Sequence, residues 1–64
     1  MIRKARFNKN MSQKELGKHI GLSQSSISRI ETGKSKALSV QKILDISLVL
    51  DLDPVEVFMF IAQL

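Results

Sequence analysis

The stretch QSSISRIE, residues Gln24 to Glu31, decides the fold of this 64-residue chain. Ile27 and Ile30 are three residues apart, so they share one face if the segment is helical. Gln24 and Arg29, together with the serines, then project elsewhere. The stretch therefore predicts a short helix with an apolar back and a front of side chains that form hydrogen bonds.

A second helix is predicted just before this stretch. Ser12 followed three residues later by Glu15 is a capping-box signature. In such a box the hydroxyl accepts an amide near the helix start, and the carboxylate reaches back to the cap. The helix should begin at about Gln13, and Leu16 and Ile20, four residues apart, should form its buried face.

The connection between these two helices is short. Gly21 stands just past the end of the first, where a positive φ is cheap only for glycine, and Ser23 stands where it can cap the second. Gly17 would let the backbones approach closely at the crossing. Residues 13–31 therefore predict a helix-turn-helix, for which the plainer alternative is an ordinary pair of antiparallel helices.

Further helices are predicted on both sides of this unit. Ile2 to Lys9 should form one, with Ile2, Ala5 and Phe7 as apolar anchors and Asn10 ending it in the left-handed conformation. Gly33 should end the third helix. A fourth should follow Ser39, because one stripe at 3.6 residues per turn contains Val40, Ile43, Ile46, Ser47 and Leu50.

The last helix, predicted over about residues 54–63, begins with Asp53 as cap, Pro54 at the first helical position and Glu56 completing a capping box. It is apolar almost all round. A chain this short buries only about 60% of the surface that its unfolded form exposes, so its own core cannot cover every face of this helix. A partner subunit is therefore expected.

The charges are divided between the two parts of the chain. All ten Lys and Arg lie within residues 1–42, which hold only two acidic residues, whereas residues 43–64 hold four acidic residues and no base. The formal charges are therefore +8 and −4. The first part is suited to bind a polyanion, although clustered lysines are often only a solvated surface.

Composition argues against several other classes. The chain has no cysteine, one histidine (His19), no metal-ligand cluster and no phosphate-binding glycine loop, so we expect no enzyme, no metal, no cofactor and no small-molecule substrate. No apolar run approaches the roughly 20 residues that a membrane span needs. We expect a soluble, cytoplasmic, single-domain protein over residues 1–64.

The pattern resembles the lambdoid phage repressor and Cro type of helix-turn-helix, also called the xenobiotic-response-element family. The resemblance spans nearly the entire chain and rests on SQKELG (12–17), IGLSQ (20–24), ISRIE (27–31), Gly33 and LDLDPVEVF (50–58). The sequence departs from the family at Gly17, where alanine is usual, at Asn10, where glycine is common, and after Lys36, where proline is frequent. The resemblance implies an all-α fold, a compact bundle of five short helices.

The resemblance also implies residue roles on double-stranded DNA. The base-reading positions match Gln24, Ser25, Ser28 and Arg29, and the phosphate-binding candidates are Gln13, Ser23, Ser26, Lys34 and Lys36. Glutamine pairs bidentately with adenine and arginine with guanine, whereas serine side chains contact bases weakly or through water, so specificity should depend mainly on Gln24 and Arg29. The plainer reading of these residues is a set of solvated polar side chains.

Two further expectations concern structure and assembly. Arg6 and Glu31 match a charged pair in the family, and Val57 and Phe58 match its inward positions. The remaining apolar face should form a homodimer interface that contains Leu44, Leu48, Phe60, Ile61 and Leu64. A two-fold dimer would set two recognition helices about 34–36 Å apart and so require a palindromic site.

The function predicted from these features is a sequence-specific transcriptional regulator, a repressor that occupies an operator as a homodimer. The alternative is a protein-interaction module of the antirepressor or antitoxin type, which would act through the apolar C-terminal helix. The charge of +8 on residues 1–42 favours the first.

Overall fold

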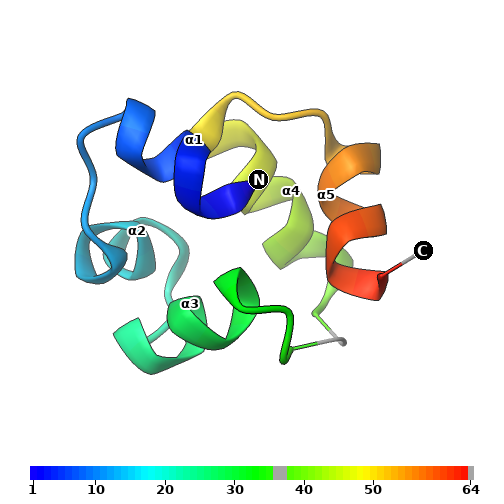
Figure 1. The fold of residues 1–64 in the computed structure, drawn as a ribbon, viewed down its shortest axis with the longest axis horizontal. Coiled ribbons are helices and arrows are strands. Elements are labelled where there is room, and N and C mark those ends of the chain that lie inside the picture. Colours follow the sequence, from blue (N-terminus) through cyan, green and yellow to red (C-terminus); the bar gives the residue numbers. More distant parts are fainter. Residues whose placement is uncertain (36–37, 64) are drawn as a thin grey trace.

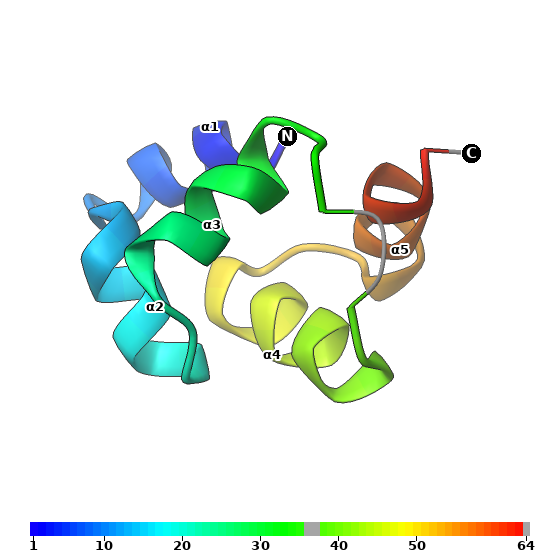
Figure 2. The same ribbon diagram turned by 90° about the horizontal axis from the view of Figure 1, so that it is seen from below.

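The computed structural model describes residues 1–35 and 38–63, and it confirms the expected all-α fold (Figure 1). The five helices are α1 (Ile2–Asn8), α2 (Gln13–Ile20), α3 (Gln24–Glu31), α4 (Val40–Leu50) and α5 (Pro54–Ala62). Figures 1 and 2 both show α2 at one end of the molecule and α5 at the opposite end.

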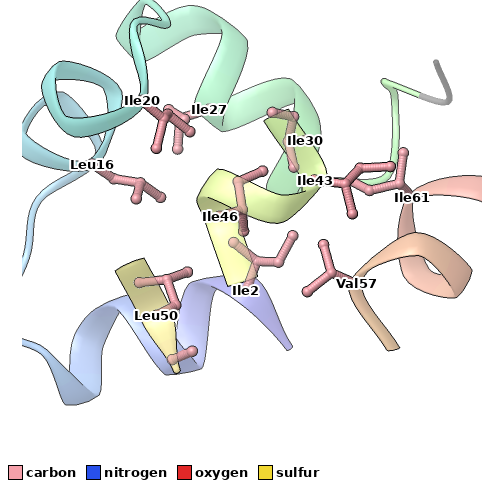
Figure 3. Close-up of a cluster of buried hydrophobic side chains, with 11 residues drawn as sticks. Ile2, Leu16, Ile20, Ile27, Ile30, Ile43, Ile46, Leu50, Val57 and Ile61 are labelled. Atoms are coloured by element: carbon pink, nitrogen blue, oxygen red, sulfur yellow. The ribbon is translucent and has the colours of Figure 1, made fainter. Parts of the chain in front are cut away.

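The core contains aliphatic side chains from all five helices (Figure 3). Six of them are essentially inaccessible to water, namely Ile2, Leu16, Ile27, Ile30, Ile46 and Val57. The isoleucine pair of α3 lies in this cluster with Leu16 and Ile20 of α2. The buried faces predicted for α2 and α3 are thus the observed ones, and the opposite side of α3 is left to solvent.

The helix starts follow the predicted caps, with one exception. Ser12 Oγ accepts a hydrogen bond from the Glu15 amide at 3.0 Å, and Glu15 Oε1 accepts one from the Ser12 amide at 3.0 Å, so the predicted capping box is present. At α5, Asp53 Oδ1 accepts from the Val55 amide at 2.8 Å. The box predicted with Glu56 is wrong, because the aspartate caps the second amide of the helix instead of the third.

The turns also behave as expected. Asn10 and Gly21 adopt positive φ values of 54° and 72°, which end the first two helices in the left-handed conformation. A Cβ atom added to Gly17 would lie well inside van der Waals contact of the Leu22 carbonyl oxygen, because the turn folds back onto α2 at that point. Glycine at this position is therefore a packing requirement of this backbone.

Three apolar side chains lie outside the core, contrary to prediction. Phe7 is 55% exposed, because the buried face of α1 is formed by Ile2, Ala5 and Arg6. Val40 is 74% exposed, since the buried stripe of α4 starts one turn later, at Ile43.

Phe58 is the third of these side chains. It is 48% exposed, because Val57 and Ile61 are the buried residues of α5 and Phe58 points to a different side. The inward assignment of Phe58 was wrong, whereas Val57 is fully buried as expected.

Candidate nucleic-acid interface

Four of the predicted DNA-contacting side chains lie together on one surface. Gln13, Gln24, Ser25 and Ser28 line a single shallow hollow where the N-terminal ends of α2 and α3 meet. Gln24 and Ser25 are exposed, and Ser28 is half-buried one turn further along α3. The structure thus brings together polar groups from two helices that are separated in sequence by the turn.

Arg29 is exposed on α3 but does not line this hollow. It lies in the last turn of the helix, where its positive charge also compensates the partial negative charge of the helix end. The front of α3 therefore carries a glutamine at its first position and an arginine near its last turn.

The orientation of α3 is held by its cap and by its buried face. Ser23 Oγ accepts from the Ser26 amide at 3.1 Å and donates to Ser26 Oγ at 3.0 Å. Ile27 and Ile30 are each 1% exposed. Because the cap fixes the first turn and the isoleucines fix the rotation about the helix axis, the directions of Gln24 and Arg29 are both determined.

The remaining phosphate candidates differ in their surroundings. Ser23 is exposed but its hydroxyl is engaged in the cap, and Ser26 is half-buried. Lys34 is exposed just after α3, and Lys36 lies outside the described residues. Lys34 is therefore the described lysine of this loop that can approach a DNA strand.

Gln13 connects the start of α2 with the end of α3. Its Nε2 donates to Glu31 Oε1 at 3.0 Å, so one amide hydrogen of the side chain is already used within the protein. The first backbone amides of α2 have no partners inside the helix and point outward along its axis. An anion at this position would be bound by these amides as well as by the side chain.

Behind this surface Arg6 and Glu31 form the expected ion pair. Arg6 Nε lies 2.6 Å from Glu31 Oε2, Arg6 Nη2 donates to Glu31 Oε1 at 3.2 Å, and Arg6 Nη1 donates to the carbonyl oxygen of Met11 at 2.8 Å. Both side chains are more than nine-tenths buried. The pair ties α1 to the C-terminal end of α3.

The buried contacts of Glu31 with Arg6 and Gln13 affect the pKa of its carboxyl group. Burial has the largest single effect and raises the pKa, but the hydrogen bonds from Arg6 and Gln13 and the charges of Arg6 and Arg3 outweigh it. The pKa therefore lies below its ordinary value. Glu31 thus stays ionised at neutral pH and keeps Arg6 paired.

The exposed side chains of α5 were not identified from the sequence. Val55, Phe58 and Met59 are exposed, whereas Ile61 is buried and Phe60 is half-buried against the core. Ile61 and Phe60 were expected on the partner-facing side, and for Ile61 this is wrong because its surface is covered by its own chain. A helical stripe centred on Val57 and Ile61, four residues apart, would have indicated the correct face.

The other predicted interface residues belong to α4. Leu44 and Leu48 are exposed and line a hollow that continues to Pro54 at the start of α5. Leu64 lies outside the described residues. Exposed apolar side chains therefore remain on α4, beside the start of α5, and separately on α5 itself.

No group of three or more His, Cys, Asp or Glu side chains within residues 1–35 and 38–63 is placed to hold a metal ion. In the same described ranges, no helix is both long enough and apolar enough to cross a membrane.

The five-helix bundle, with its capped and outward-facing third helix, is consistent with the class of all-α helix-turn-helix domains. A family model described as "Helix-turn-helix" matches residues 2–57, from the start of α1 into α5. The chain belongs to this family, the lambda repressor and Cro type, and is a DNA-binding transcription regulator. No curated protein and no solved structure matches the chain.

Proposed function

We propose that this protein is a sequence-specific repressor that binds a palindromic operator as a homodimer and inserts α3 into the major groove. The observation that carries the proposal is the surface shared by Gln24, Ser28 and Gln13 at the helix-turn-helix. On it a side chain able to read a base lies beside a helix start suited to bind a phosphate. Occupying the operator would block transcription.

The base contacts are assigned by side-chain chemistry. Gln24 has the donor and acceptor needed to pair with adenine N6 and N7, and Arg29 has the fork that matches guanine O6 and N7. Ser25 and Ser28 are too short for bidentate contacts and would act directly at close range or through water. Specificity should therefore come from one position near the start of α3 and one near its end.

Selection of bound duplexes from a random DNA library tests this assignment. The parent chain should select an inverted repeat. Gln24→Ala and Arg29→Ala should each relax preference at one position of the half-site, at a cost of about 1–3 kcal/mol for the preferred base. Ser25→Ala is the matched control on the same helix and should change preference far less. Selection of no common sequence by the parent chain would refute the proposal.

The homodimer is supported by exposed apolar side chains on α4 and α5, of which α5 lies at the end of the molecule opposite α2 (Figure 1). We assign the contact to Leu44 and Leu48 of α4 together with Phe58 and Met59 of α5, in place of the buried Ile61. A two-fold contact at α5 would leave both recognition helices free. Their separation would then have to match one turn of B-DNA, about 34–36 Å.

Sedimentation tests the assembly. Leu48→Glu and Met59→Glu should give folded monomers, because each places a charge on an apolar contact. Asn8→Glu introduces the same charge on the exposed side of α1 and should sediment like the parent chain. If both variants of the apolar surface also sediment like the parent, the interface is wrongly placed.

The second candidate function is a protein-interaction module acting through α5. The exposure of Val55, Phe58 and Met59 on one short helix favours it, since such a patch usually marks a contact site. The salt dependence of DNA binding separates the two. The logarithm of the affinity should fall by about 0.9 per neutralised phosphate for each unit of log salt if DNA is the main partner, and a shallow dependence would favour the second function.

A further inference from the structure

Arg3 and Phe7 form an exposed pair on α1 next to the proposed DNA-binding surface. The two residues are four apart on the helix, and the Arg3 guanidinium carbon lies 5.5 Å from the centroid of the Phe7 ring. Such a contact between a cation and an aromatic face limits the positions of the guanidinium while leaving its N–H groups open. The Arg6 guanidinium carbon lies 4.6 Å from the same centroid, so the Phe7 ring contacts both arginines of α1.

This pair lines a hollow between α1 and α3. Arg3 and Phe7 line it on the α1 side, and Gln24 and Ser28 line it on the α3 side. Gln24, Ser28 and Gln13 also line the hollow between α2 and α3, so the two hollows have these three residues in common. A DNA strand beside α3 would therefore also pass close to Arg3.

Arg6 lines the same hollow, but its guanidinium is already used. Nε, Nη1 and Nη2 all donate hydrogen bonds within the protein, to Glu31 and to the carbonyl oxygen of Met11. Its charge is balanced by the Glu31 carboxylate at 2.6 Å. Among the described residues that line this hollow, Arg3 is the remaining cation.

We propose that Arg3, positioned by Phe7, binds a phosphate of the DNA backbone and so makes α1 an additional edge of the DNA-binding surface. The proposal rests on the function proposed above. A phosphate is the matching ligand, because the planar guanidinium fork binds its oxygens in pairs. The lowered pKa of Glu31, to which the charge of Arg3 contributes, agrees with an Arg3 side chain directed toward this hollow.

The salt dependence of binding to the selected duplex tests this contact. Arg3→Gln should make the slope of log affinity against log salt shallower by about 0.9. The ratio of the variant's affinity to the parent's affinity should therefore change about threefold between 50 and 200 mM salt. Lys4→Gln removes the same charge from an exposed neighbour that does not line the hollow, and it should keep the parent's slope. The loss caused by Arg3→Gln should be equal for operator and unrelated duplexes, because phosphates carry no sequence information.

Two further variants separate charge from position. Arg3→Lys should keep the parent's slope because it keeps the charge. Phe7→Leu should weaken DNA binding about two- to fivefold, because the Arg3 guanidinium is then no longer held by the ring. Equal slopes for Arg3→Gln and Lys4→Gln would overturn this inference while leaving the function intact, as would a reduced slope for folded Arg3→Lys. If the parent chain binds no duplex, the proposed function fails and this inference fails with it.

Discussion

Arg6 Nε donates to Glu31 Oε2 at 2.6 Å, and this contact joins the first helix to the end of the third across 25 residues of sequence. The carboxylate also accepts from Gln13, so α1, α2 and α3 meet at one buried anion. Because α3 carries the base-reading side chains, this network helps to determine how the recognition helix lies on its support.

The ion pair should contribute strongly to stability. Arg6→Ala leaves the Glu31 carboxylate buried without its main partner, so we expect a loss of about 3–5 kcal/mol in the free energy of unfolding. Lys4→Ala, on an exposed part of the same helix, should change it by less than about 0.5 kcal/mol. Urea denaturation of both variants measures the difference. Equal transition midpoints would show that the pair adds little.

Stability should fall in acid in a way that depends on Glu31. The pKa of Glu31 is lowered in the folded protein from its ordinary 4.5, so the unfolded chain binds the proton more strongly. The stabilisation is therefore present above about pH 4.5 and is lost as the pH falls through the lower pKa of the folded state.

Glu31→Gln tests this directly. The variant should have a lower free energy of unfolding than the parent at pH 7. This difference in free energy should become smaller below pH 4.5. Denaturation measured at a series of pH values gives the difference. A difference in free energy of unfolding that stays constant down to pH 3 would contradict the lowered pKa of Glu31 as a source of stability.

The serine that caps α3 should contribute more to the free energy of unfolding than an exposed serine beside it. Ser23→Ala removes the acceptor of the Ser26 amide and should cost about 1 kcal/mol, whereas Ser25→Ala should be close to neutral. Thermal unfolding compares them. Because both serines lie on the proposed DNA surface, the same variants measured for DNA binding separate loss of helix order from loss of contact.

The burial pattern of α4 predicts very different costs for two aliphatic truncations. Ile46→Ala removes a fully buried side chain and should destabilise by about 2–5 kcal/mol. Val40→Ala shortens an exposed side chain at the first position of the same helix and should change stability by less than about 0.5 kcal/mol. Comparable losses of unfolding free energy for the two variants would mean that Val40 is also buried and that the buried stripe of α4 begins one turn earlier.

Local signals in the sequence were sufficient for most of the fold. The Ser12 and Glu15 box, the left-handed Gly21 and the Ile27 and Ile30 pair each depend on groups within a few residues, so their structural outcome was predictable. Periodicity was weaker evidence at α5, where apolar residues occupy almost every position. Val57 and Phe58 are both apolar neighbours, and only one of them is buried.

The candidate site was predictable in part. The spacing within α3 identified Gln24 and Arg29 as outward side chains, and both are exposed. The Arg6 and Glu31 pair came from resemblance to a family, because no local pattern relates residues so far apart. Arg3 and Phe7 were missed, since their spacing of four residues becomes meaningful only beside α3.

The amino-acid sequence by itself determined where the helices start and stop, which face of α3 is apolar, and that the basic residues precede the acidic C-terminal part. Tertiary structure alone decided which side of α5 remains open and that Arg3 of α1 lines a hollow together with Gln24 and Ser28 of α3. The physical reason is the range of the interactions. Caps and turns are satisfied within one turn of chain, whereas burial and ion pairing depend on neighbours that only folding brings into contact.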